Sequence, residues 1–248
     1  QSGQYTLGMQ VSRPVASPVS LLADISSLVY TDEKAVGLSS ASTHILAGGI
    51  SYAPSHAVSI APLVGYRWDD QGSLRDHGPH YALTAQMRDL FLDGYRLGAD
   101  LHLQEDRLDP RTLENHGARA TVQRTFEGRT RDSLDLAVVR TRREFYAPSD
   151  TLRGVDSRTE NLLAFANLLD YDLSRSLLAS LYVSIYTRGL QRDTRSVGSL
   201  PAPGAFGSAI DEFRLETFLQ TTYGEGMGGI GGFLKLFYGE RTESHEAR

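Results

Sequence analysis

Histidines are the residues of this chain best suited to acid–base chemistry. The seven of them stand mostly at predicted turns or loops: His44, His56, His77, His80, His102, His116 and His245. A hydrolase needs a serine, a histidine and an acid whose side chains converge, yet neither Gly-x-Ser-x-Gly nor His-Glu-x-x-His occurs in the sequence. We therefore predict no enzyme, no catalytic residue and no cofactor.

Two acidic segments raise the possibility of a metal site. The first could bind a cation or form an acid–histidine pair, but a solvated loop is the simpler interpretation of it: Asp69, Asp70, Asp76, His77 and His80. The second matches no calcium-loop template: Glu105, Asp106, Asp109 and Glu114. The sequence predicts no resident metal ion.

Composition limits the class of protein. The chain has 248 residues, of which 40% are hydrophobic and 22% charged, so it should fold, and all-β barrels of this length form one domain. We expect a single domain over residues 1–248. With no cysteine, disulfide frameworks, thiolate metal sites and cysteine nucleophiles are excluded.

Charge and hydropathy exclude two further classes. The net charge is −5, and Lys34 and Lys235 are the only lysines among 25 basic residues, so no cationic stripe suited to nucleic acid stands out. The longest apolar run, Leu162–Ala166, is far shorter than the ~20 residues of a membrane-spanning helix. Neither a nucleic-acid partner nor a helical membrane protein is expected.

The hydrophobic pattern has a period of two, as in β-strands. Between Arg96 and Gln104 every second residue is apolar, and the intervening residues include Asp100 and His102. The same alternation predicts twelve strands, most of 9–13 residues: Tyr5–Val11, Val19–Tyr30, His44–Ala53, Ala57–Asp69, His80–Leu92, Arg96–Gln104, Gly117–Phe126, Ser133–Phe145, Asn161–Tyr171, Ser176–Arg188, Phe213–Tyr223 and Met227–Tyr238. Ordinary soluble strands have ~5–6 residues, whereas a tilted strand that crosses a bilayer needs ~9–11.

The predicted connections alternate between tight and long. Tight turns are expected at segments 13–18, 53–56, 93–94, 127–130, 172–175 and 224–226. Longer polar loops are expected over about 31–43, 69–79, 105–116, 146–160 and 189–211, all at the opposite end of a meander. Short turns at one rim and long loops at the other are typical of outer-membrane barrels.

In these patterns the chain resembles Gram-negative outer-membrane β-barrel proteins as a general class. The resemblance implies an antiparallel up-and-down transmembrane β-barrel of about 12 strands in the outer membrane, in contact with the lipid bilayer and lipopolysaccharide. The acidic 105–116 segment could then bridge divalent cations at the lipopolysaccharide surface. A soluble β-sandwich, with the apolar parity buried between two sheets, is the alternative.

The two parities of the predicted strands then have different roles. One parity would line the lumen: Arg67, Gln86, Arg88, Arg96, Asp100, His102, Arg119, Gln123, Asp135, Tyr182, Tyr186, Arg188, Arg214, Glu216 and Lys235. Aromatic residues of the other parity would form interfacial girdles: Tyr52, Tyr66, Trp68, Tyr81, Tyr95, Tyr223 and Tyr238. Arginine and tyrosine in the lumen could bind sugar polymers, although a ladder of structural ion pairs is the simpler interpretation.

Two features depart from the usual barrel. A polar segment, 239–248, follows the last aromatic residues, and the order of the connections puts both termini at the rim of the long loops. The chain could therefore be a fragment of, or a partner in, a larger barrel protein or assembly with other envelope proteins.

As function we predict an outer-membrane channel or export conduit for small solutes or a polymer. The alternative is a plugged barrel that anchors a larger envelope or surface assembly.

Overall fold

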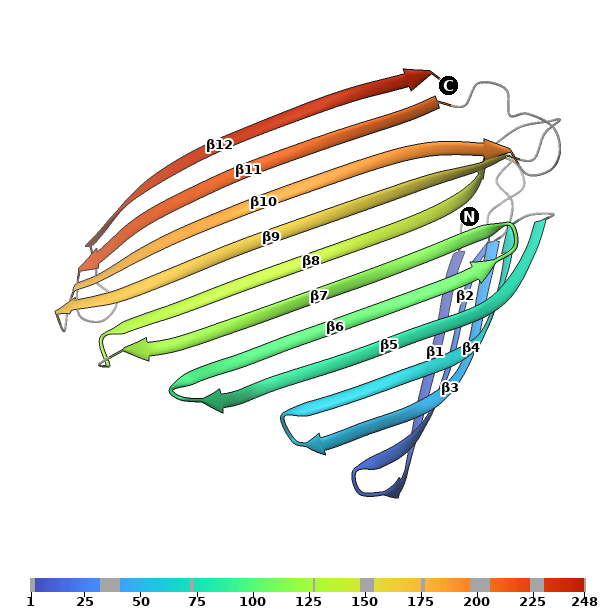
Figure 1. Cartoon of the computed structure of the whole chain (residues 1–248), viewed down its shortest axis with the longest axis horizontal. Helices are drawn as coiled ribbons and strands as arrows, with labels where there is room; N and C mark the ends of the chain where they lie inside the picture. The colour runs from blue at the N-terminus through green and yellow to red at the C-terminus, as the bar shows by residue number, and fades with distance from the viewer. Residues whose placement is uncertain are drawn as a thin grey trace.

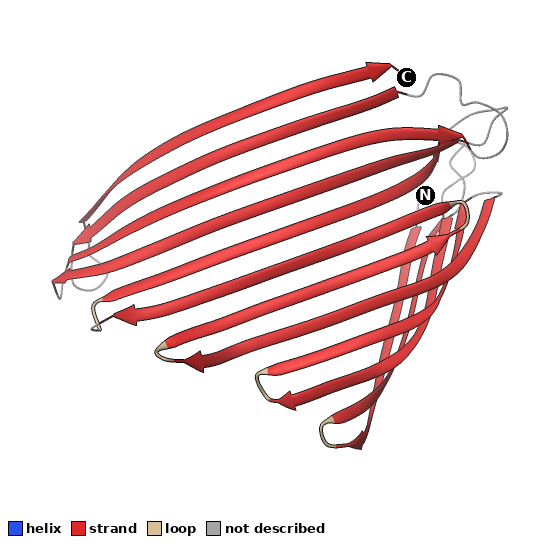
Figure 2. Cartoon of the chain, viewed as in Figure 1, coloured by secondary structure: helices blue, strands red, loops and turns tan. Residues whose placement is uncertain are grey.

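The computed structural model describes residues 3–31, 41–71, 74–126, 128–147, 154–174, 177–196, 206–223 and 230–247. This part of the chain contains twelve β-strands and no helix (Figure 2). The strands are β1 (Gly3–Ala16), β2 (Val19–Thr31), β3 (Ala41–Ser55), β4 (Val58–Gln71), β5 (Leu74–Leu92), β6 (Tyr95–Leu108), β7 (Arg111–Phe126), β8 (Thr130–Ala147), β9 (Gly154–Ser174), β10 (Leu177–Ser196), β11 (Phe206–Tyr223) and β12 (Ile230–Ala247).

The strands form one up-and-down sheet in which each is antiparallel to the next, in the order β1 to β12 (Figure 1). This confirms the all-β class, the strand number and the meander predicted from the sequence. The two-sheet sandwich was the wrong alternative, because all twelve strands belong to a single sheet. Among the described residues β1 and β12 are edge strands that do not pair with each other.

The pairing register gives the sheet two chemically distinct faces, because directly opposite residues project to the same side. On β6 the apolar face carries Leu97, Leu101 and Leu103, and the polar face carries Arg96 and Asp100. The registers of the neighbouring pairs carry these two faces across the sheet from β1 to β12. These two sides are the apolar face and the polar face of the sheet.

The sheet curls toward its polar face. Along β4 the apolar-face residues from Ile60 to Trp68 are exposed, whereas the polar-face residues from Ala61 to Asp69 are half-buried or buried. No second layer covers either face in the described ranges, so curvature is what shelters the polar side chains. Figure 1 shows this curl, with β1–β4 passing behind the plane of the later strands.

A conventional hydrophobic core is missing from the described residues. Only Ala47, Leu108 and Val155 are buried hydrophobic residues there, while many large apolar side chains of the apolar face are exposed. A soluble domain of this size would bury much of its apolar surface against a second layer. Here the folded sheet leaves its apolar face uncovered.

The turns at one end of the sheet are short, as predicted. The β5–β6 hairpin turns through Asp93 and Gly94, whose positive φ angles of 49° and 79° are those that a type I′ turn requires. The turns at Ser17–Pro18 and His56–Ala57 lie at this same end. The predicted turns at 172–175 and 224–226 lie partly or wholly outside the described residues.

The predicted long loops are shorter in the structure because the strands continue through them. The segment 105–116 was wrongly predicted as a loop: β6 runs to Leu108, β7 begins at Arg111, and Asp109–Pro110 forms the turn. Likewise β4 extends to Gln71 and β5 begins at Leu74. The predicted loops 146–160 and 189–211 lose residues to β9, β10 and β11 in the same way. Charged residues of these predicted loops therefore project from strands.

Both ends of the described chain lie at the end of the longer connections. Gly3 of β1 pairs with Thr31, and Ala247 of β12 pairs with Phe206, next to the 31–41 and 196–206 connections. Figure 1 places the N and C labels at this end of the sheet. The position of the termini agrees with the connection order read from the sequence.

Candidate functional site

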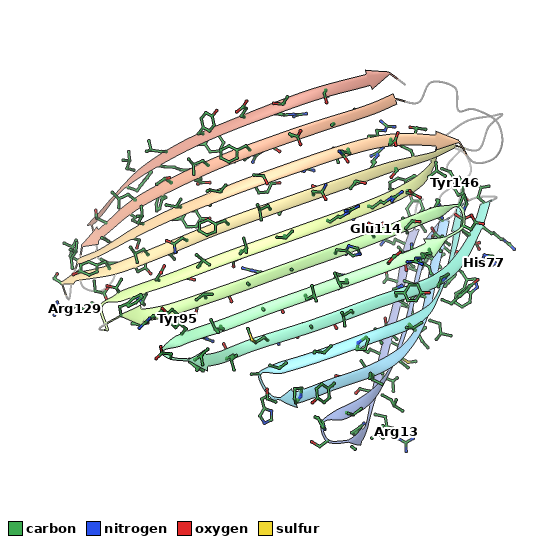
Figure 3. The ribbon with its side chains drawn as sticks, in the orientation of Figure 1. Arg13, His77, Tyr95, Glu114, Arg129 and Tyr146 are labelled. Atoms are coloured by element: carbon green, nitrogen blue, oxygen red, sulfur yellow. The ribbon has the colours of Figure 1, made fainter. Side chains whose placement is uncertain are left out.

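The polar face is the candidate functional site. The register places the predicted lumen residues on it, from Arg67 on β4 to Lys235 on β12, except Arg88, which falls at a register shift of β5 and has no paired position. They do not converge on one point, as catalytic residues would. They are spread over eight strands between β4 and β12, and Figure 3 shows the side chains distributed along the ribbons.

Ion pairs join neighbouring strands on the polar face between β7 and β12. Arg119 on β7 binds Asp135 on β8 through two nitrogens, and its side chain is 61% exposed. Further pairs join Arg188 to Glu160, with a 2.6 Å nitrogen–oxygen distance, and Lys235 to Glu216. These cations stay partly exposed to solvent, so this part of the polar face is wet.

At the end of the longer connections the tip of the β6–β7 hairpin bends over the polar face of β5. A Cβ atom on Gly78 of β5 would lie 1.9 Å from the backbone oxygen of Arg107, which leaves room only for glycine. The bend buries Leu108 and Arg111, which flank the turn. The hairpin tip therefore covers the polar face at this rim.

Arg111 is the centre of a group of buried and half-buried residues that we call the rim cluster: Arg67, Asp69, Asp76, His80, Asp106, Arg111, Glu144 and Tyr146. The Arg111 side chain is 1% exposed. Its Nη2 donates to Asp69 Oδ2 at 2.6 Å, and its Nε donates to Asp76 Oδ2 at 2.5 Å. Nη1 donates to the backbone oxygen of Glu144 at 3.3 Å. One guanidinium thus ties β7 to β4, β5 and β8.

Asp106 forms the second focus of the rim cluster. It accepts hydrogen bonds from Arg67 Nη1 at 2.8 Å and Gln104 Nε2 at 3.1 Å, and its Oδ1 lies 2.5 Å from His80 Nδ1. Asp106 lies beyond the apolar-face stretch that ends at Leu103. Burial acts to raise the pKa of Asp106, but His80 and Arg67 outweigh it and hold the pKa below its usual value.

Tyr146 and Glu144 of β8 complete the rim cluster. Tyr146 donates to Asp76 Oδ1 at 2.5 Å, and the Arg111 guanidinium carbon lies 4.9 Å from the centre of its ring. Burial and the bond to Asp76 raise the pKa of Tyr146 to about 12. Glu144 accepts a hydrogen bond from the Thr112 backbone nitrogen at 2.7 Å and one from Arg142 Nη2 at 2.6 Å. The Thr112 contact ties the hairpin tip to β8, and the Tyr146 contact ties β8 to β5.

The acidic segment 69–80 is not the solvated loop that the sequence favoured. Its residues belong to β4 and β5, and the register divides them between the faces. Asp69, Asp76 and His80 are buried on the polar face, whereas Asp70 and His77 lie on the apolar side. Within the described ranges no group of three histidine or acidic residues is arranged to hold a metal ion.

The second acidic segment is divided in the same manner. Asp106 is buried in the rim cluster, but Glu105 and Glu114 lie directly opposite each other on the apolar side of the rim. Glu105 pairs with Arg107 at 2.6 Å, and Glu114 lies near Arg140 and Arg142. Charges therefore replace apolar residues on the outside of the rim.

The predicted interfacial aromatic residues all lie on the apolar face by register. The Tyr66 and Trp68 ring centres are 4.9 Å apart near the rim, and Arg124 lies over the ring of Tyr95 near the short turns. Tyr52, Tyr81 and Tyr238 are exposed there. The Tyr223 backbone belongs to β11, but its side chain lies outside the described residues.

No protein-family model, no curated protein and no solved structure matches this chain. The described part contains no helix long and apolar enough to cross a membrane.

Proposed function

We propose that this chain forms a water-filled channel or export conduit across the outer membrane of a Gram-negative bacterium. The sheet would close into a barrel whose apolar face contacts lipid and whose polar face lines the lumen. Small solutes or a polymer would pass along the polar face. The contrast between the two faces is the observation that carries the proposal.

The apolar face supports a membrane location. On β6 the apolar-face stretch runs from Tyr95 to Leu103, nine residues, which agrees with the ~9–11 residues that a tilted strand needs to cross a bilayer. Beyond Leu103 the same side carries Glu105 and Arg107. Exposed leucines bounded by charges and aromatic rings suit hydrocarbon bounded by headgroups better than they suit water.

Closure of the sheet into a barrel follows from a membrane location. An open sheet edge in hydrocarbon leaves backbone N–H and C=O groups without partners, which costs several kcal/mol per group. The strands β1 and β12 run in opposite directions, because the strand number is even and every neighbour is antiparallel. They can therefore pair with each other, with a second copy or with strands of another segment.

Half-exposed ion pairs lie on the polar face of β7–β12, as a water-filled lumen requires. Arg119 and Arg214 pair with carboxylates, and their side chains are 61% and 54% exposed. A cavity of about 370 Å³ also remains beside the rim cluster, where Arg143 contributes to the lining.

A plugged barrel that anchors an envelope or surface assembly is the second candidate function. The rim cluster favours it, because the β6–β7 tip covers the polar face at one end. Such a barrel would carry no current. Lipopolysaccharide or other envelope proteins would then be partners of the exposed rim.

Single-channel recording in planar bilayers tests the proposal. We expect steady conductance, with the anion-to-cation selectivity of Arg96→Ala and Arg214→Ala variants shifted toward cations, because each change removes a positive charge from the polar face. Arg129→Ala, in the short turn between β7 and β8, is the matched control and should leave selectivity unchanged. A folded protein that stays silent would favour the anchor.

A further inference from the structure

Aromatic rings gather on one part of the polar face. They lie on the adjacent strands β10, β11 and β12, and we call them the aromatic strip: Tyr182, Tyr186, Phe218, Phe233 and Phe237. On the nine other strands the register assigns three aromatic residues to the described polar face, each on a different strand: Tyr30, Phe91 and Phe145. The Tyr146 ring lies against Arg111 in the rim cluster. The strip is thus a local concentration of aromatic rings on the polar face.

One end of the strip is a row of rings across three strands. Tyr182 lies directly opposite Phe218, and the Phe218 and Phe233 rings stack with their centres 5.8 Å apart. Phe233 is 76% exposed, so the row ends in an aromatic surface that is open to solvent. Aromatic surface left open to water is available to a ligand with an apolar face.

The other end lies four residues further along β10, ~13 Å away. Here the guanidinium of Arg214 lies 5.8 Å from the Tyr186 ring centre. Opposite Arg214 stands Gly239, and a Cβ atom there would come within 3.1 Å of the Phe237 ring. The glycine therefore lets Phe237 lie flat along the polar face beside Arg214.

Charged groups between the rings already have partners. Arg214 pairs with Glu212, Lys235 with Glu216, and Arg188 with Glu160. The strip therefore presents hydrogen-bond donors and acceptors together and, among these described residues, no cation without a carboxylate. An anionic ligand would have to compete with these carboxylates, and an acyl chain would desolvate them.

We propose that the aromatic strip binds neutral oligosaccharide chains. A sugar ring has a C–H face that packs on an aromatic ring, and its hydroxyls donate to carboxylates and accept from guanidinium groups. Aromatic rings at Tyr182 and Tyr186, ~13 Å apart along β10, with Phe237 level with Ser184 between them, would hold successive parts of one chain. This inference rests on the proposed function, since it makes the lumen a path for saccharides.

Isothermal titration calorimetry of the full chain in detergent micelles tests the strip without requiring conduction. The probes are maltohexaose, which is neutral, and a hexameric oligogalacturonate, which is acidic. We expect maltohexaose to bind and the acidic probe to bind at least about fivefold more weakly. Phe218→Ala and Tyr182→Ala should each weaken maltohexaose binding by about five- to tenfold, because each removes one stacking surface.

Phe91→Ala is the matched control, because Phe91 is an exposed polar-face ring on β5, away from the strip. It should leave the affinity unchanged. Heat-dependent migration in gels identifies the variants that fold, and Phe237→Ala replaces any that do not. The inference is overturned if maltohexaose does not bind, if the acidic probe binds more tightly, or if Phe91→Ala weakens binding as much as Phe218→Ala.

The outcome separates this inference from the channel itself. Conductance without maltohexaose binding would overturn saccharide binding by the aromatic strip and leave the channel proposal standing. Binding without conductance would support the strip and contradict the channel.

Discussion

The Arg111→Ala variant should have a free energy of unfolding about 3–5 kcal/mol below that of the unmodified chain. The change leaves the buried carboxylates of Asp69 and Asp76 without their shared partner, and uncompensated buried charge is strongly destabilising. Urea titration in micelles measures the loss, with the fluorescence of Trp68, the one tryptophan, as the probe.

Arg107→Ala supplies the control for this experiment. Arg107 belongs to the same hairpin tip, but its side chain is exposed, pairs with Glu105 and lies over the ring of Tyr81. Its loss should leave the unfolding midpoint nearly unchanged. Equal midpoints for the two variants would mean that the rim cluster does not hold the hairpin tip in place.

A charge on the apolar face should be nearly as damaging once lipid is present. We expect Leu181→Arg to reduce the free energy of folding into lipid vesicles by about 2–4 kcal/mol, because position 181 lies in the middle of the apolar stretch of β10 and would put arginine in hydrocarbon. At an ordinary water-exposed position the same substitution would cost little.

Ser184→Arg tests the opposite face of the same strand. Ser184 lies on the polar face opposite Glu216, so arginine there would meet water and a carboxylate. Folding into vesicles should be almost unaffected. If both variants, or neither, lose stability, the two faces do not have the environments that we propose.

Much of the fold is predictable from the sequence because the alternation is local. Leu97, Leu101 and Leu103 share one parity, and that parity alone defines a strand with two different faces. Twelve such segments and the Asp93–Gly94 turn are enough to predict a meander. Strand ends were predicted less well, because charged residues such as Asp106 interrupt a hydrophobic pattern without interrupting the hydrogen-bonded ladder.

The lining of the polar face followed from parity, but the rim cluster did not. Arg111 and Asp69 are 42 residues apart and meet only because the hairpin tip bends over Gly78. Continuing the alternation past Gln104 would have put Asp106 on the same face as Asp100. No local pattern gives the bend, since it depends on contacts between strands that are distant in sequence.

Thiol modification during single-channel recording probes which face lines the conduction path. The chain has no cysteine, so a single substitution is the only reactive thiol. Arg119→Cys places it on the wet polar face, and Leu101→Cys places it on the apolar face. A positively charged methanethiosulfonate reagent should change the current of the Arg119→Cys channel at once and leave that of Leu101→Cys unchanged. Absence of current, or equal response of the two variants, would contradict a barrel whose polar face lines a water-filled lumen.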